Sequence, residues 1–294
     1  MEFIKLNNGV KMPQLGYGVY QVTKEECERC VLDALKAGYR AIDTAQSYFN
    51  EEEVGNAIRK SGIPREEIFL TSKVWVEHYG YEECKASVFE SMKKLKMDYI
   101  DLMLLHQPFA DYYGAWRALE ELYEEGKLRA IGISNFYPDR MVDLASFSRI
   151  RPMVNQIEIH PHNQQKTAKE WNEKYGIQVE AWAPFGEGRG GMFELPELKI
   201  IGEKYKKSPA QIILRWHLQR GIVVIPKSTH AERMEENMNV FDFELSEEDM
   251  NIIAALDKET SSFFSHQDPA MVEWFVQMVE ERKKEHGSTK ESKR

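Results

Sequence analysis

The chain of 294 residues has little of what marks several common classes of protein. Its three cysteines are too few for the disulfide framework of a small secreted domain. Cys27 and Cys30 have the spacing of a redox pair, but they lie in a helical pattern, and no second cysteine pair completes a zinc site. We therefore expect three reduced thiols, as in a reducing compartment.

The sequence also lacks long apolar runs and an excess of positive charge. No apolar stretch is long enough to cross a bilayer, and no signal-peptide pattern follows Met1. These absences predict a cytoplasmic protein without a membrane partner. The net charge of −9 argues against a nucleic-acid partner, which favours a basic surface. An anionic cofactor would need a local basic pocket.

The usual glycine-rich phosphate loops are missing as well. No Gly-x-Gly-x-x-Gly follows a strand and opens a helix, and no Gly-Lys-Ser/Thr loop is present. The run Gly186-Glu-Gly-Arg-Gly-Gly191 resembles the first motif only superficially, because no helix pattern begins within it. A dinucleotide would therefore bind without a Rossmann domain.

What is present is a repeated alternation of short apolar strands and amphipathic helices. Eight strands are expected, at residues 15–20, 40–43, 69–73, 100–105, 130–133, 153–157, 178–182 and 222–225. Helical patterns lie between them, at 24–38, 51–60, 81–96, 112–126, 138–147, 164–175 and 208–220. Strands that alternate with helices indicate parallel crossovers, and eight such units indicate a closed (β/α)8 TIM barrel of the α/β class.

The two ends of the chain lie outside this repeat. Residues 3–12, with a turn at Asn7-Asn8-Gly9, predict an N-terminal β-hairpin at the bottom of the barrel. After the eighth strand, helical patterns return at 231–237, 245–256 and from about 270. We expect one domain over residues 1–280 and a charged, disordered tail over 281–294.

Polar residues follow the expected strands at the point where each one ends. They are Asp43, Lys73, His106, Ser134, Gln156, Trp182 and Lys227. The carboxyl ends of the strands meet at one mouth of such a barrel, and that mouth holds the active site in barrel enzymes. A buried Asp43 needs a cation, which Lys73 offers. A lysine near Tyr48 would lower the phenol pKa from its ordinary value of about 10.

Several motifs together resemble those of the aldo-keto reductase family, in particular its bacterial members that reduce keto-sugars and keto-acids, such as the 2,5-diketo-D-gluconate reductases. The motifs are Gly38-Tyr-Arg-Ala-Ile-Asp43-Thr-Ala, Tyr48, Thr71-Ser-Lys73, Leu105-His106, Gly132-Ile-Ser-Asn-Phe136, Asn155-Gln-Ile-Glu-Ile-His-Pro161 and Ile225-Pro-Lys-Ser228. The resemblance covers nearly the whole chain. It implies NADPH-dependent reduction of a small aldehyde or ketone to the alcohol.

The resemblance also implies a role for each residue of the site. Tyr48 would donate a proton, tuned by Lys73, which Asp43 holds; His106 would orient the substrate carbonyl. NADPH would be bound by Ser134, Asn135, Gln156, Trp182, Lys227, Ser228, Arg233, Glu236 and Asn237. Tyr20, Trp75, His106 and Gln107 would form the substrate wall. Many family members have tryptophan where this chain has Gln107, which predicts a more polar wall.

Two further expectations concern the cofactor. Lys227 and Arg233 follow the eighth strand, where barrels place phosphate sites, and Arg233 falls in the first turn of a helix. We expect these cations to meet a 2′-phosphate, whereas an NADH site would place a carboxylate against the 2′-hydroxyl. The segment 186–191 lies in an unusually long interval between strands, and its glycines suit a lid over the pyrophosphate.

Alternatives stay open at this point. A nucleotide-sensing subunit of the same fold would bind NADPH with little turnover. His160-Pro-His162 is a metal pattern, which together with Asp43 and His106 would suggest a barrel metallohydrolase. However, the first strand carries no His-x-His, the pair also fits the family's Glu-x-His-Pro stretch, and we expect no metal. The sequence leaves open the substrate, the preferred direction, the contribution of Phe263 and Phe264, and the choice between a monomer and a weak homo-oligomer.

Overall fold

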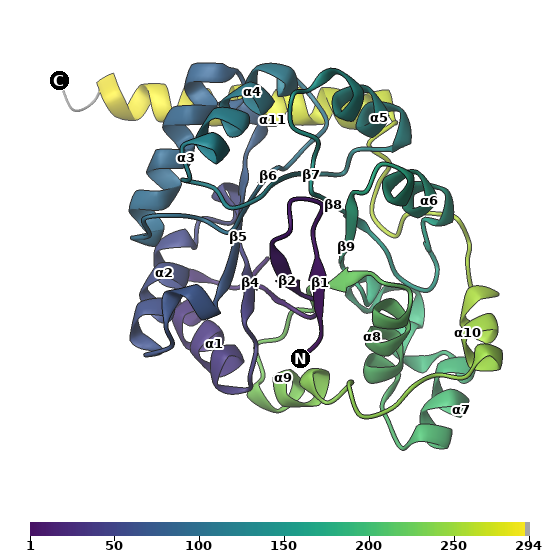
Figure 1. The fold of residues 1–294 in the computed structure, drawn as a ribbon. Coiled ribbons are helices and arrows are strands. Elements are labelled where there is room, and N and C mark those ends of the chain that lie inside the picture. The colour runs from purple at the N-terminus through teal and green to yellow at the C-terminus, as the bar shows by residue number, and fades with distance from the viewer. Residues whose placement is uncertain (292–294) are drawn as a thin grey trace.

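The computed structural model describes residues 1–291, with side chains as far as Arg282. The chain begins with an antiparallel hairpin of β1 (Phe3–Lys5) and β2 (Lys11–Pro13), in which Ile4 lies opposite Met12. The predicted hairpin is confirmed. Figure 1 shows it across the middle of the ring of strands, so it covers one end of the barrel.

Eight parallel strands form the barrel wall in sequence order. They are β3 (Tyr17–Gly18), β4 (Ala41–Asp43), β5 (Phe69–Val74), β6 (Leu102–Leu105), β7 (Ile131–Ser134), β8 (Val154–Glu158), β9 (Gln178–Trp182) and β10 (Val223–Val224). The first and last strands join: Gly16 N donates to Val224 O at 2.8 Å, and Gly18 N donates to Pro226 O at 3.1 Å. The sheet therefore closes on itself, which confirms the predicted (β/α)8 barrel.

Helices surround the strands as an outer ring (Figure 1). They are α1 (Lys24–Lys36), α2 (Glu51–Lys60), α3 (Tyr81–Leu95), α4 (Tyr112–Glu124), α5 (Pro138–Phe147), α6 (Lys166–Lys174), α7 (Pro196–Tyr205), α8 (Pro209–Gln219), α9 (Ala231–Met238), α10 (Glu247–Ala254) and α11 (Pro269–Glu291). The sequence did not predict α7, which fills much of the long interval before the eighth strand. Within the described residues, no helix combines the length and apolar character needed to span a membrane.

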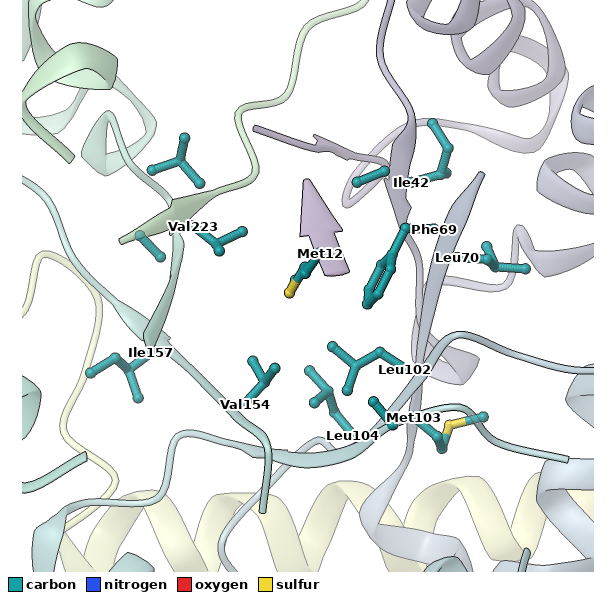
Figure 2. Packing of buried hydrophobic residues seen from close by; sticks show 14 of the residues in the cluster. Met12, Ile42, Phe69, Leu70, Leu102, Met103, Leu104, Val154, Ile157 and Val223 are labelled. Carbon is teal, nitrogen blue, oxygen red and sulfur yellow. The ribbon is translucent and has the colours of Figure 1, made fainter. Parts of the chain in front are cut away.

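The interior of the barrel changes from apolar to polar along the strands. Figure 2 shows Phe69, Leu102, Leu104 and Val154 pointing inward around Met12 of the hairpin. Side chains two and four residues further along a strand share its inner face. The same face of β5 that carries Phe69 therefore presents Lys73, and the face that carries Val154 presents Gln156 two residues later. The apolar layer thus closes one end of the barrel and supports a polar layer above it.

At the opposite end of the barrel, α11 packs over the rim where β5 and β6 end. Phe275 of α11 packs against the rings of Trp75 and Phe109, with centroid distances of 6.0 and 5.2 Å. The helix continues to Glu291, which differs from the disordered tail expected from residue 281. Glutamate, lysine and arginine are good helix formers, so a charged segment can extend a helix that packing has already started. The last three residues of the expected tail, 292–294, lie outside the described residues.

Candidate active site

Lys73 is the centre of a hydrogen-bonded cluster at the mouth of the barrel. Its Nζ lies 2.5 Å from Asp43 Oδ1, 3.0 Å from the carbonyl oxygen of Thr44 and 3.3 Å from the hydroxyl of Tyr48. Asp43 ends β4, and Tyr48 ends the short 3-10 helix η1 (Gln46–Tyr48) that follows it. We call Asp43, Tyr48, Lys73 and His106, which the sequence predicts to be catalytic, the catalytic cluster. The structure brings all four together, as the sequence predicted.

The lysine of this cluster remains a cation despite complete burial. Burial alone disfavours its charged form, but the carboxylate of Asp43 and the phenol of Tyr48 outweigh that effect and raise the pKa of Lys73. A buried ion pair of this kind needs further hydrogen bonds to offset desolvation. Here the carbonyl of Thr44 and the amide of Gln156, whose Nε2 lies 2.9 Å from Asp43 Oδ2, provide them.

The phenol of Tyr48 does not follow the expected shift. Removal from water raises its pKa to about 12, although the nearby cation of Lys73 lowers it. The expectation of a net lowering was therefore wrong, because the desolvation of the phenol outweighs the effect of the lysine. At neutral pH Tyr48 accordingly carries its proton, the form that a general acid requires.

His106 lies beside Tyr48 with an uncharged ring. Its ring centroid is 5.7 Å from that of Tyr48 and 5.1 Å from that of Trp75, and its Nδ1 is 3.4 Å from Ser47 Oγ. Burial, with repulsion from Lys73 and His266, holds the pKa of His106 well below its usual range. The ring is therefore a neutral hydrogen-bond partner at physiological pH.

The expected substrate wall divides into two groups. Tyr20 and Trp75 are next to the cluster: the ring of Tyr20 lies 5.1 Å from that of Tyr48, and Trp75 packs on His106. Gln107 faces the C-terminal segment instead, since its Oε1 lies 2.9 Å from Nε2 of His266. A polar side chain does occupy this position, but its amide oxygen is already paired.

The two phenylalanines left open by the sequence lie in different places. The ring of Phe263 is 5.1 Å from that of Trp182, on the side of the barrel that carries β9. Phe264 packs on His266 at 4.7 Å and on Phe275 at 6.0 Å, within the aromatic cluster under α11. Phe263 is therefore near the predicted cofactor side, and Phe264 supports the C-terminal segment.

Residues predicted to meet the nicotinamide form one hydrogen-bonded chain. Ser134 Oγ donates to the carbonyl oxygen of Gln156 at 2.8 Å, and Asn135 Nδ2 donates to that of His106 at 3.0 Å. Trp182 Nε1 donates to Asn135 Oδ1 at 2.9 Å. Asn135 has a φ of 65°, in the left-handed region that asparagine tolerates. The ends of β7, β8 and β9 are thereby tied into one surface.

The other end of the predicted cofactor site carries exposed positive charge. Lys227 follows β10, and Arg233 lies in the first turn of α9; both are exposed. Among the side chains that the structure describes, no carboxylate pairs with either cation. Ser228 Oγ accepts a hydrogen bond from His230 N at 3.1 Å, just before α9 begins. We call Lys227, Ser228 and Arg233 the phosphate end; two unpaired cations at a helix N-terminus fit a phosphate-bearing cofactor.

The predicted adenine-side residues are partly engaged within the protein. Glu236 accepts a hydrogen bond from Ser208, the N-cap residue of α8. Asn237 belongs to α9 and is buried, and Tyr39 Oη donates to the carbonyl oxygen of Met234 in the same helix at 3.3 Å. The contact of Glu236 with Ser208 therefore helps to hold α9 in position, whatever contact Glu236 makes with a nucleotide.

The glycine-rich segment expected to form a lid contacts the C-terminal segment. Backbone φ angles are positive at five of its six residues, 186–188, 190 and 191. Arg189 donates to the carbonyl oxygen of Ser262 at 2.8 Å, and its guanidinium lies 4.3 Å from the ring centre of Phe263. One arginine thus links this segment to the residues beside Trp182.

The contacts of the His-x-His pair, His160 and His162, are made with residues outside the catalytic cluster. His160 Nε2 lies 2.8 Å from Glu158 Oε1, and the rings of His160 and His162 are 6.4 Å apart. Glu158 also accepts hydrogen bonds from Ser261 Oγ and Ser262 N. Among the described residues, no group of three or more histidine, cysteine or acidic side chains is placed to hold a metal ion.

Three side chains near the site escaped the sequence analysis. Glu180 lies inside the barrel with its Oε2 2.9 Å from Gln156 Nε2. Its signal was present: it stands two residues before Trp182 in an apolar strand, so both share the inner face. His266 and Arg282, whose guanidinium lies 5.3 Å from the ring of Trp75, come from the C-terminal segment. No strand-end pattern points to these two.

A closed (β/α)8 barrel with the catalytic cluster at the C-terminal ends of its strands is typical of a barrel enzyme. The model of the aldo/keto reductase family matches residues 6–258, so the chain belongs to that family. It is 50% identical over 258 residues to a glyoxal reductase of Bacillus subtilis strain 168, across 87% of this chain and 93% of that protein. Over 258 residues it is 42% identical to methylglyoxal reductase DkgA of Escherichia coli strain K12, with the same two coverages, 87% and 93%.

A solved structure extends the comparison to the cofactor. An aldo-keto reductase of Bombyx mori in complex with NADP matches with a TM-score of 0.86 at 35% identity, over 90% of this chain and 95% of that chain. The protein is accordingly an NADP-dependent oxidoreductase of the aldo-keto reductase family, and NADPH is its cofactor. The exposed cations of the phosphate end fit that assignment.

Proposed function

We propose that this protein reduces a small carbonyl compound to the alcohol, with 2-oxoaldehydes such as glyoxal and methylglyoxal as its first candidate substrates. The observation that carries the proposal is the contact between Lys73 Nζ and the Tyr48 hydroxyl at 3.3 Å, at a mouth lined by aromatic rings. Relatives named for glyoxal and methylglyoxal reduction support the substrate class. Keto-sugars and keto-acids remain the next candidates.

Each residue of the catalytic cluster has one task in this proposal. Bound NADPH supplies the hydride that the carbonyl carbon accepts. Tyr48 gives its phenolic proton to the carbonyl oxygen, and Lys73 stabilises the phenolate that remains. The neutral ring of His106 hydrogen-bonds the same oxygen and fixes its orientation. Asp43 holds Lys73 in place and keeps it charged.

The cofactor would be held at both ends of the mouth. Ser134, Asn135 and Gln156 would bind the nicotinamide amide, and the half-buried indole of Trp182 would offer it a stacking surface. Lys227, Ser228 and Arg233 would bind the 2′-phosphate, with Glu236 and Asn237 on the adenine side. Tyr20 and Trp75 would enclose the substrate.

We further propose that residues 1–280 form one folding unit and that the protein acts in the cytoplasm as a monomer or weak homo-oligomer. The net charge of −9 supports the absence of a nucleic-acid partner.

Turnover by the purified protein tests the proposal. NADPH oxidation is followed at 340 nm, within about pH 6–8, with methylglyoxal, glyoxal, a keto-acid and a keto-sugar as separate substrates. We expect the highest kcat/KM with the 2-oxoaldehydes. Binding of NADPH without reduction of any of the four substrates would contradict a reductase and favour the nucleotide-sensing alternative.

A further inference from the structure

Glu180 is a buried carboxyl group that the steps above do not use. It lies in the middle of β9, opposite Gln156 of β8 and Val223 of β10, and 1% of it is exposed. Its Oε2 accepts a hydrogen bond from Gln156 Nε2 at 2.9 Å. The same Nε2 donates to Asp43 Oδ2, also at 2.9 Å. One amide therefore bridges two carboxyl groups inside the barrel.

The charges inside the barrel do not balance if both carboxyl groups are ionised. Within residues 1–282, Lys73 is the one cation in contact with this group, and its three N–H donors are matched by Asp43, Thr44 O and Tyr48. Among the described side chains, Glu180 has no cationic hydrogen-bond partner. Two buried carboxylates that share one cation leave a charge uncompensated in a medium of low dielectric. One of the two must hold a proton.

The contacts decide which carboxyl group that is. Asp43 contacts both the Lys73 cation and the Gln156 amide, whereas Glu180 contacts the Gln156 amide alone. Burial and repulsion by the Asp43 carboxylate raise the pKa of Glu180 to about 8, against the smaller opposing effects of Gln156 and Lys73. Asp43 and Lys73 are the charged groups that act on Glu180, because Tyr48 is uncharged at neutral pH. At neutral pH Glu180 is therefore mostly a neutral acid.

We propose that Glu180 is a positioning residue that acts in its protonated form, holding Gln156 against Asp43 and leaving the charge of Lys73 to Asp43 and Tyr48. This inference rests on the proposed role of Tyr48. When Tyr48 has given its proton to the carbonyl oxygen, the group of Asp43, Lys73 and Tyr48 carries one net negative charge. An ionised Glu180 would make it two and oppose the transfer.

The pH dependence of the chemical step tests this role. Glu180→Gln keeps the shape and an oxygen acceptor for Gln156 but cannot ionise. Single-turnover reduction of methylglyoxal by the NADPH complex is measured from pH 6 to 9.5. The wild-type rate should fall by up to about tenfold between pH 7 and 9 as Glu180 loses its proton. The variant should stay within about twofold over the same range. The same decline in both proteins would overturn the proposal.

Unfolding gives a second readout that needs no turnover. The folded-state pKa of Glu180 is raised above its unfolded value of 4.5, so its contribution to stability is fully present below pH 4.5 and is lost as pH rises through about 8. Glu180→Gln does not titrate. The midpoint of urea unfolding of the variant, relative to wild type, should therefore increase from pH 5 to 8 and then level off. A difference that stays constant with pH would show a purely structural role.

Glu51 supplies a matched control. It is also a buried glutamate, 2% exposed, but it belongs to α2 in the outer layer and accepts its hydrogen bond from Ser72 Oγ at 2.7 Å. Glu51→Gln should leave the pH profile of the reduction unchanged. If Glu180→Gln does not accumulate, Glu180→Thr removes the carboxyl group and keeps a hydroxyl. Failure of the unfolding prediction rejects the neutral Glu180 alone, whereas absence of any carbonyl reduction rejects the proposed reductase.

Discussion

The catalytic cluster and the phosphate end, at the two ends of the mouth, differ in how their positive charges are neutralised. In the catalytic cluster, Lys73 is buried and its three donors are satisfied within the protein. At the phosphate end, Lys227 and Arg233 are exposed, and no described carboxylate neutralises them. The positive charge that acts on the phenol of Tyr48 is held in place by protein groups before substrate binds. The positive charges that would hold the anionic cofactor remain unpaired within the described part of the protein, so they are free to bind its phosphate. Loss of the buried cation should therefore affect both folding and catalysis, whereas loss of an exposed cation at the phosphate end should affect only cofactor binding.

The largest effect is expected from Lys73→Met. The change leaves Asp43 as a buried carboxylate without its cation, so the free energy of unfolding should fall by about 3–5 kcal/mol. It also removes the charge that lowers the pKa of Tyr48, so that pKa should rise further and kcat should fall by about 10² or more. Urea unfolding and steady-state kinetics measure the two effects.

Lys60→Met is the control for that prediction. Lys60 pairs with Glu28 at 2.6 Å, but its side chain is 61% exposed, so the pair should contribute about 1 kcal/mol or less. Equal losses of stability in the two variants would contradict the view that the buried cation differs in kind from a surface one.

The next effect concerns the phosphate end. Arg233→Ala should weaken NADPH binding by about ten- to a hundredfold, the equivalent of one charge-assisted hydrogen bond of roughly 1.5–3 kcal/mol, and leave NADH binding nearly unchanged. Its unfolding midpoint should not move. Cofactor fluorescence titration measures both affinities. Lys199→Ala, which removes an exposed cation on α7 that pairs with Glu194, should change neither. Equal losses for NADPH and NADH would show that Arg233 does not bind the 2′-phosphate.

The smallest effect is expected in segment 186–191. Arg189 anchors this segment to Ser262 and Phe263, close to Trp182. If the segment closes over the cofactor, saturating NADPH should slow proteolysis within it severalfold. Arg189→Ala should speed cleavage of the free protein. Cleavage rates that do not respond to NADPH in either protein would leave the segment as an ordinary surface connection.

The fold could be predicted because the barrel repeats a simple pattern. Short apolar runs ending in Asp43, Lys73 and His106 recur at nearly even spacing, and the alternation of side chains along a strand places those residues inside. Helix α7 was missed because its buried apolar side chains, Leu198 and Ile201, are few and stand among charged neighbours. A helix of that kind forms through packing rather than through its own pattern.

Site residues that stand at strand ends could be predicted from the sequence. Site residues that reach the mouth from a distant part of the chain could not. The C-terminal segment brings His266 to Gln107 and Arg282 to Trp75, and it lies beyond the residues that match the family. The sequence shows which groups can meet but not how far each is removed from water. For that reason it predicted the effect of Lys73 on Tyr48 and missed the larger, opposite effect of burial.

Tyr48→Phe tests the proposed proton transfer most directly, because it removes the phenolic proton and keeps the ring. The rate of a single turnover of NADPH with methylglyoxal should fall by at least about 10², while the dissociation constant of NADPH stays within about twofold. The unfolding midpoint should hardly change, since the ion pair of Lys73 and Asp43 remains. Near-normal turnover in this variant would contradict the assignment of Tyr48 as the proton donor.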